Sequence, residues 1–153
     1  MKKMFFVLLA VSLLLCSCGG SFTVNVKEAG PAMAEATGYA FLEYDADSIY
    51  NDTGISEDMY VNGFFAWLLE ASVGNCACVA VFEAADAEKA EEIETYLQAY
   101  LTDMQLVQKE YNADNYQLTL NAELKVDGNY VVFSVAPDNT AVINAFNSAK
   151  VSQ

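Results

Sequence analysis

Two cysteines separated by a single alanine, Cys76 and Cys78, are the residues whose type and spacing could most directly do chemistry. In an extended strand both thiols point to one face of the sheet, because successive side chains alternate. Their Cα atoms then lie about 6.6 Å apart, near the upper limit for a disulfide, so a bridge needs a bulge or kink. We expect two small buried hydrophobic side chains. The alternatives are a structural or labile disulfide and a redox or metal-linked role.

The composition narrows the chemistry further. The chain contains no histidine and no arginine. Ser-His and Cys-His catalytic pairs, histidine metal sites and bidentate arginine contacts to phosphate are therefore excluded. Zinc at the two cysteines would need two further ligands, which have to be carboxylates. No pair of carboxylates stands out from the acidic background as an acid-base pair. We predict a protein that is not an enzyme and that has no cofactor or metal.

The aromatic residues suggest a second kind of site. The chain has nine tyrosines and one tryptophan, which could form a platform for a peptide or a glycan. We expect most of these side chains to lie in the core and on the faces of a sheet. A ligand platform is the alternative.

The acidic charge limits the partners. Seven lysines face 21 acidic residues, and two of them, Lys2 and Lys3, belong to a segment that we expect to be removed, which leaves 5 − 21 = −16. Such a surface repels phosphate backbones and anionic lipid headgroups. We therefore predict no nucleic-acid partner.

The N-terminus has the pattern of an export signal. Lys2 and Lys3 precede an apolar run from Phe5 to Leu15. This run of about eleven residues is too short to span a membrane, which needs about twenty. We predict a secretion signal and not a permanent membrane helix.

The residues after the apolar run resemble the lipobox of bacterial lipoproteins, with Leu15 three places before Cys18, Ser17 just before it and Gly19 after it. The resemblance implies that residues 1–17 are a signal peptide and that Cys18 carries a diacylglycerol anchor. Residues 18–25 are then a short tether and 26–153 a single domain. The protein would be held at the outer face of the cytoplasmic membrane. Secretion without an anchor is the alternative.

One long helix from Asp86 to Tyr111 is expected to organise the domain. Its apolar residues alternate in steps of three and four and therefore share one stripe, with Asp86 as the N-cap. The stripe consists of Ala90, Ile93, Leu97, Tyr100, Met104, Val107 and Tyr111.

The other segments predict an α+β fold. The strand at 76–83 is apolar on both faces, which is typical of a central strand covered on both sides. Asp127-Gly128 predicts a hairpin in which Leu124 pairs with Val131. We predict a mostly antiparallel four-stranded sheet with the long helix across one face, in the order ααββαββα. The remaining predicted elements are helices at 26–39 and 45–51, strands at 59–69, 118–126 and 131–135, and a last helix that begins at Pro137.

Several of these stretches together are similar to a family of uncharacterised lipoproteins from Gram-positive, largely clostridial bacteria, known as a domain of unknown function. They are the lipobox, the segment from Tyr50 to Ile55, Val79-Ala80-Val81-Phe82 before an acidic helix, and Gly128-Asn129-Tyr130-Val131-Val132. The resemblance implies no catalytic or binding residue beyond Cys18. Relatives tend to have an acidic residue near Cys78, where this chain has a thiol.

These observations favour a noncatalytic, lipid-anchored module outside the cell membrane that binds an envelope protein, a peptide or a glycan. The alternatives are a redox or metal-linked accessory protein that uses Cys76 and Cys78, and a structural protein of the envelope. The sequence alone does not name the ligand.

Overall fold

The computed structural model describes residues 22–69 and 76–153. In these ranges the chain forms α-helices, one short 3-10 helix (η1) and β-strands. In order they are β1 (Phe22–Val24), α1 (Val26–Glu35), β2 (Phe41–Glu43), α2 (Ala46–Thr53), η1 (Glu57–Met59), β3 (Tyr60–Leu68), β4 (Cys78–Ala84), α3 (Ala87–Tyr111), α4 (Ala113–Leu120), β5 (Glu123–Asp127), β6 (Tyr130–Val135), α5 (Asn139–Ser148) and β7 (Lys150–Ser152).

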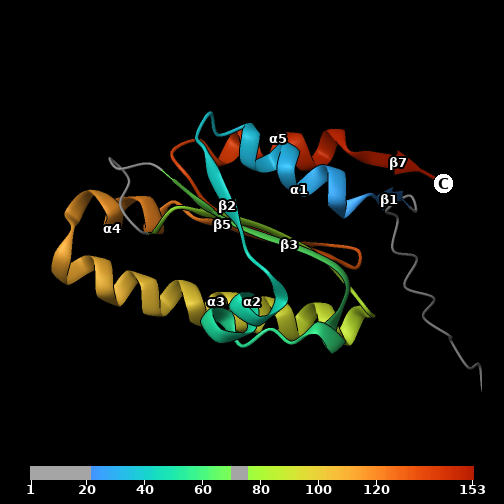
Figure 1. Cartoon of the computed structure of the whole chain (residues 1–153), viewed down its shortest axis with the longest axis horizontal. Coiled ribbons are helices and arrows are strands. Elements are labelled where there is room, and N and C mark those ends of the chain that lie inside the picture. The colour runs from blue at the N-terminus through green and yellow to red at the C-terminus, as the bar shows by residue number, and fades with distance from the viewer. Residues whose placement is uncertain (1–21, 70–75) are drawn as a thin grey trace, which may run out of the picture.

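The molecule has three layers. An antiparallel sheet with the strand order β2-β3-β4-β6-β5 forms the middle layer. Helices α1 and α5 lie on one face of this sheet, and α2 and α3 lie on the other (Figure 1). A separate ribbon of β1 and β7 lies at one end of the molecule, and α4 lies at the opposite end.

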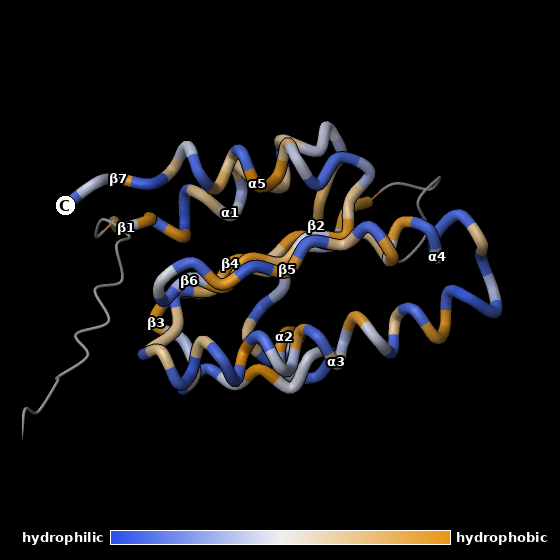
Figure 2. Tube along the Cα trace, turned by 180° about the vertical axis from the view of Figure 1, so that it is seen from behind, coloured by the Kyte–Doolittle hydropathy of each residue, from blue (hydrophilic) through white to orange (hydrophobic). Residues whose placement is uncertain are grey.

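Strand β4 is the centre of the sheet and is buried on both faces. Cys78, Ala80 and Phe82 belong to the hydrophobic cluster on the α3 side. Val79 and Val81 belong to the cluster on the α1 and α5 side. The prediction of a central strand covered on both sides is confirmed. Figure 2 shows hydrophobic residues along the middle strands, between the two helical layers.

Helix α3 forms as predicted, with Asp86 as its N-cap: the Asp86 carboxylate accepts a hydrogen bond from the backbone N–H of Lys89 at 2.8 Å. Only part of the predicted stripe is buried, because the C-terminal end of α3 runs past the sheet (Figure 1). Val107 is 53% exposed and Tyr111 is 85% exposed. The buried residues of α3 are Ala90, Ile93, Leu97, Leu101 and Met104.

The prediction of a four-stranded sheet with one long helix, in the order ααββαββα, is wrong. The main sheet has five strands, a second sheet has two, and five α-helices lie in the described ranges. The missing edge strand, β2, spans only three residues, too few to show a period of two. It exists because it pairs with the end of β3, with Leu42 opposite Trp67.

The predicted strand at 118–126 is also wrong over its first half. Residues up to Leu120 form α4, and the strand begins at Glu123. Helix α3 ends at Tyr111 as predicted, with Asn112 as its C-cap, but the Asn112 side chain also accepts a hydrogen bond from the backbone N–H of Asn115 and thereby starts a second helix. Asn112 is therefore both the C-cap of α3 and the N-cap of α4.

The β5-β6 hairpin turns at Gly128-Asn129, one residue later than predicted. Leu124 therefore pairs with Phe133, and Val126 pairs with Val131. The register differs from the prediction by two residues, so the same side chains still face α3, because side chains alternate with a period of two. Gly128 has a φ of 63°, which favours glycine.

The first described strand is fastened to the domain by a tyrosine hydroxyl. The Tyr130 hydroxyl accepts a hydrogen bond from the Val24 N–H at 3.0 Å and donates one to the Val24 carbonyl at 3.4 Å. The Phe22 ring stacks on the Tyr130 ring, with 5.6 Å between their centroids. Lys150 of β7 lies over the Phe22 ring and is hydrogen-bonded to Asp127. The N-terminal end of the described chain is therefore held firmly against the sheet.

Replacing Tyr130 by phenylalanine should lower the free energy of unfolding by about 1–3 kcal/mol, because it leaves the buried Val24 N–H without its acceptor. Urea denaturation followed by the fluorescence of the single tryptophan, Trp67, measures the loss. Tyr111→Phe is the control, since that exposed residue should change stability by less than about 0.5 kcal/mol. Equal midpoints for the two variants would contradict the role of the hydroxyl.

Candidate functional site

An aromatic corner lies where the β2 edge of the sheet meets α3, and we define it as Tyr44, Phe65, Trp67, Tyr100 and Phe133. Tyr44 follows β2, Phe65 and Trp67 lie on β3, Tyr100 lies on α3 and Phe133 lies on β6. The Tyr44 ring centroid is 5.6 Å from that of Phe65 and 6.2 Å from that of Trp67. The Tyr100 centroid is 6.1 Å from that of Phe65 and 6.3 Å from that of Phe133. Three elements, β3, α3 and β6, and the residue that follows β2 thus contribute to one continuous group of rings.

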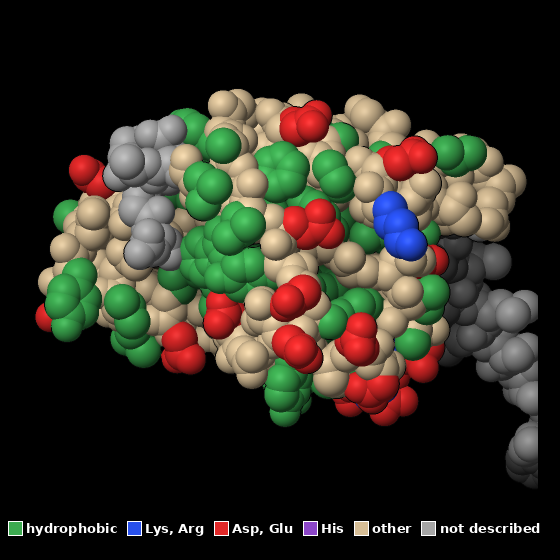
Figure 3. All heavy atoms as spheres, in the orientation of Figure 1, with side chains coloured by type: hydrophobic (Ala, Val, Ile, Leu, Met, Phe, Trp, Pro, Cys, Tyr) green, Lys and Arg blue, Asp and Glu red, His purple; other side chains and the backbone are tan. Residues whose placement is uncertain are grey.

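The aromatic corner is partly open to solvent. Phe65 and Phe133 are fully buried, whereas Tyr44, Trp67 and Tyr100 are only partly buried and pack over them. Figure 3 shows hydrophobic side chains gathered left of centre on this face, at the level between the sheet and α3, with acidic side chains below them. Two of the five rings therefore lie in the core, as expected for most of the aromatic residues, and the other three reach the surface.

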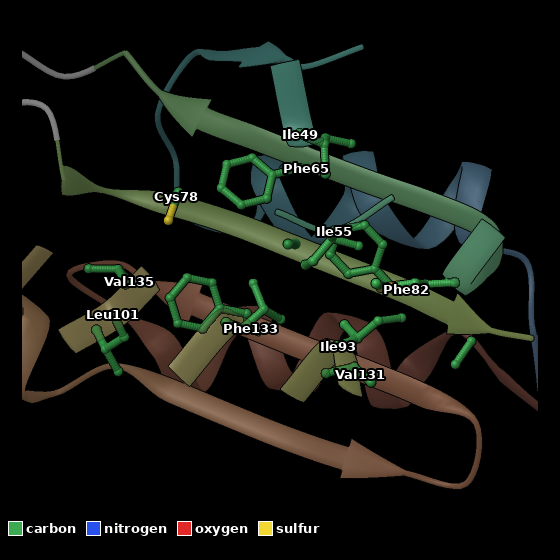
Figure 4. Close-up of a cluster of buried hydrophobic side chains, with 14 of the residues drawn as sticks. Ile49, Ile55, Phe65, Cys78, Phe82, Ile93, Leu101, Val131, Phe133 and Val135 are labelled. Atoms are coloured by element: carbon green, nitrogen blue, oxygen red, sulfur yellow. The ribbon is translucent and has the colours of Figure 1, made fainter. Parts of the chain in front are cut away.

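Cys76 and Cys78 lie beneath this corner, in the same cluster as Phe65 and Phe133. Both are fully buried, and no disulfide joins them. Figure 4 shows Cys78 on β4 beside Phe65 and near Val135. The Cys76 thiol lies 3.9 Å from the carbonyl oxygen of Asn115 and donates to it. The structure brings the two cysteines together on one face.

Burial sets the reactivity of the two thiols. It raises the pKa of Cys76 to about 11, from an ordinary value of 9.0. It raises the pKa of Cys78 well above that ordinary value, and the neighbouring Cys76 adds to the shift. A thiolate is the nucleophile in disulfide exchange and the ligand for zinc. Both groups are therefore protonated and weakly reactive at neutral pH in the folded protein.

The polar groups of the corner are two phenols, one indole N–H and the carboxylate of Asp52. Burial raises the pKa of Tyr44, and the negative charge of Asp52 raises it further. Burial, followed by Cys78 and Asp52, raises the pKa of Tyr100 far above its ordinary value. Both phenols keep their protons and can donate hydrogen bonds. The buried Nε1 of Trp67 has no hydrogen-bond partner in the described chain.

A groove lies on the opposite side of the sheet from the aromatic corner. It is a groove of about 450 Å³ between α1 and α5, next to the β1-β7 ribbon. Alanines at 29, 32, 145 and 149 form much of its wall, together with Asn25 and Glu28. Small side chains leave this groove open, but they supply little that could orient a ligand.

The predictions on lipid attachment and metal binding concern other parts of the chain than the aromatic corner and the groove. Cys18, the predicted lipid attachment, lies outside the described residues. Within the described ranges, no group of three or more acidic or cysteine side chains is arranged to hold a metal ion. No helix among the described residues is both long enough and apolar enough to cross a membrane.

Comparison with known protein families assigns most of the chain to a family. Residues 37–136 match a family described as Domain of unknown function (DUF4358). The chain belongs to this family. The matched range contains the five-stranded sheet, α2, α3, α4 and the whole aromatic corner with both cysteines, whereas α1, α5 and the β1-β7 ribbon lie outside it. No curated protein and no solved structure matches the chain.

Sequence reasoning identified the two cysteines and the abundance of aromatic residues in this DUF4358 chain, but it missed which aromatics meet. Tyr44 precedes a helix and carries no pattern that ties it to Trp67. The contact depends on the pairing of β2 with β3, which brings Leu42 opposite Trp67. The position of Asp52 near both phenols was missed for the same reason, because Asp52 lies on α2, Tyr44 follows β2 and Tyr100 lies on α3.

The thiols of the folded protein should react with iodoacetamide far more slowly than those of the unfolded protein at pH 7–8. The raised pKa of Cys76 predicts that the folded-state rate keeps increasing with pH up to about 11, whereas the rate of a thiol in the unfolded chain levels off near the ordinary pKa of 9.0. Mass spectrometry of a Cys16→Ser/Cys18→Ser chain measures the rate, because only Cys76 and Cys78 then report. Labelling at the same rate with and without denaturant would contradict the burial of the pair.

Proposed function

We propose that this DUF4358 protein is a noncatalytic binding module, held at the outer face of the cytoplasmic membrane by a lipid on Cys18. The observation that supports the proposal is that few residues separate the lipobox cysteine from β1, the strand that the Tyr130 hydroxyl holds against the sheet. Only Gly19, Gly20 and Ser21 separate Cys18 from Phe22, where β1 begins. Four extended residues span at most about 14 Å.

This short tether gives the domain a defined orientation in the proposal. The end with β1 and β7 faces the membrane, and the end with α4 points away from it (Figure 1). The aromatic corner then lies on the side of the molecule, at the level of α3. A binding surface on a tethered domain has to face away from the bilayer or along it, and the corner and α3 satisfy this condition.

The acidic charge does not set this orientation, because α3 begins at the same end of the molecule as the β1-β7 ribbon (Figure 1), and the orientation in the proposal depends on the tether. Asp127, near the proposed membrane end, is neutralised by Lys150 at 2.6 Å and Lys125 at 3.1 Å, and hydrogen bonding to Lys150 lowers its pKa. In helix α3, by contrast, the acidic residues outnumber the lysines. Helix α3 carries Glu88, Glu91, Glu92, Glu94, Asp103 and Glu110 against Lys89 and Lys109.

A redox accessory function is the second candidate. In its favour, Cys76 and Cys78 lie in one cluster beneath the aromatic corner. Against it, the raised pKa values keep both thiols protonated, and neither sulfur is exposed. A structural role in the envelope is a third candidate, with no feature of the described residues that favours it over binding.

Replacing Cys18 by alanine should move the protein from the membrane fraction to the unanchored fraction and remove radioactive palmitate labelling. The lost acyl chains supply the hydrophobic free energy of anchoring, about 0.8 kcal/mol per buried CH₂. Fractionation and labelling of cells that produce each variant are the measurements.

Cys16→Ala is the matched control, because Leu15 occupies the position before Cys16 where the lipobox needs a small residue. It should leave both anchoring and labelling unchanged. If the Cys18→Ala chain stays on membranes with its label, the proposed anchor is wrong.

A further inference from the structure

Helix α3 carries an exposed seam beside its buried stripe, formed by Tyr96, Tyr100, Val107 and Tyr111. The residues are spaced by four, seven and four, so they lie along one flank of the helix. Tyr96 is 39% exposed, Tyr100 is partly buried at the aromatic corner, and Val107 and Tyr111 are largely exposed. The seam runs about 22 Å along α3, from the middle of the sheet to the overhanging end.

The outer half of this seam continues a packed surface. Nearer the N-terminus, the same side of α3 packs on the sheet through Ile93 and Leu97, which are fully buried. Where α3 runs past the sheet, no described part of the chain covers Val107 and Tyr111 in this way, and α4 contacts a different side of the helix through Gln105 and Gln108. The overhang thus offers an apolar surface for a further element to pack on.

The charges beside the seam specify the partner. Asp103 and Glu110 are exposed and seven residues apart, which places them on the outer side of the seam. Lys109, the nearest lysine in the chain, lies on another side of α3, where it lines a small groove with Leu106 and Tyr116. A second copy of this chain would bring acid against acid, which is unfavourable. The complementary surface is apolar in the middle and basic at its flank.

We propose that the α3 seam binds an amphipathic helix of a partner protein that has an apolar stripe flanked by lysine or arginine. The spacing of four, seven and four along α3 matches the stripe of such a helix, which recurs every three to four residues. This inference rests on the proposed binding function and names its partner class. The partner docks beside the sheet, as α3 itself does, and the tether leaves this flank accessible.

The test uses the full chain and a synthetic three-heptad peptide with leucine along one stripe and lysine beside it. Fluorescence anisotropy of the labelled peptide measures binding. Val107→Ala and Tyr111→Ala should each weaken binding about tenfold, or about 1.4 kcal/mol. Asp103→Asn/Glu110→Gln should weaken it and reduce its salt dependence.

Leu106→Ala is the matched control. Leu106 is 62% exposed and neighbours Val107 in the sequence, but it lies about 100° away around the helix. It should bind like the unmodified chain. A peptide with the same leucine stripe and glutamate in place of lysine should not bind, and neither should a peptide of the same composition with its leucines scattered.

Three outcomes would overturn the proposal: an equal loss in Leu106→Ala and Val107→Ala, equal binding of the scattered peptide, or a dimer of the chain that Val107→Ala disrupts. The first two indicate general attraction to an acidic protein, and the third indicates self-association. Peptide binding is measured on chains with and without Cys18→Ala. Loss of the lipid anchor and loss of peptide binding at the α3 seam can then be distinguished.

Discussion

The structure depends on the burial of strand β4 on both of its faces. A strand whose odd and even residues are all apolar has to be covered on both sides, because exposing either face leaves a row of apolar side chains in water. Val79 and Val81 require a helical layer on one side, and Ala80 and Phe82 require one on the other. The third layer, α1 with α5, is therefore as necessary as α3. Each buried valine or phenylalanine contributes about 1.5–3 kcal/mol.

The helical layers on the two faces of the sheet cover β4 with side chains of different size. The aromatic corner results from this difference. On the α1 side, close packing is achieved by small residues: Gly30 lies against the Phe64 ring so tightly that even a methyl group has no room. On the α3 side, large aromatic rings fill the space, and they spread outward to the surface at the aromatic corner. Helix α3 is also longer than the sheet it covers, so its seam extends beyond the core.

Sequence reasoning succeeded where a segment carried its own signal and failed where structure arose from distant pairing. Strand β4, helix α3 and its N-cap Asp86 were predictable because burial or capping marks them locally. Strands β1, β2 and β7 have three residues each and form only because partners far along the chain pair with them. Helix α4 was misread because Leu118 and Leu120 alternate with polar residues, as they would in a strand. Of the site, the two cysteines were predictable, but the meeting of Tyr44, Trp67 and Tyr100 was not.

The same logic separates the parts of the molecule that hold it together from the parts that can bind. Cys76 and Cys78 have the types and spacing that could most directly do chemistry, but they are core residues in the folded state, as expected, and burial raises the pKa of both thiols. Val107 and Tyr111 looked like ordinary members of a core stripe, and the structure leaves them exposed. An apolar stripe that extends past the sheet can still pack against another apolar surface. On an acidic surface that disfavours self-association, that capacity is directed toward a basic partner.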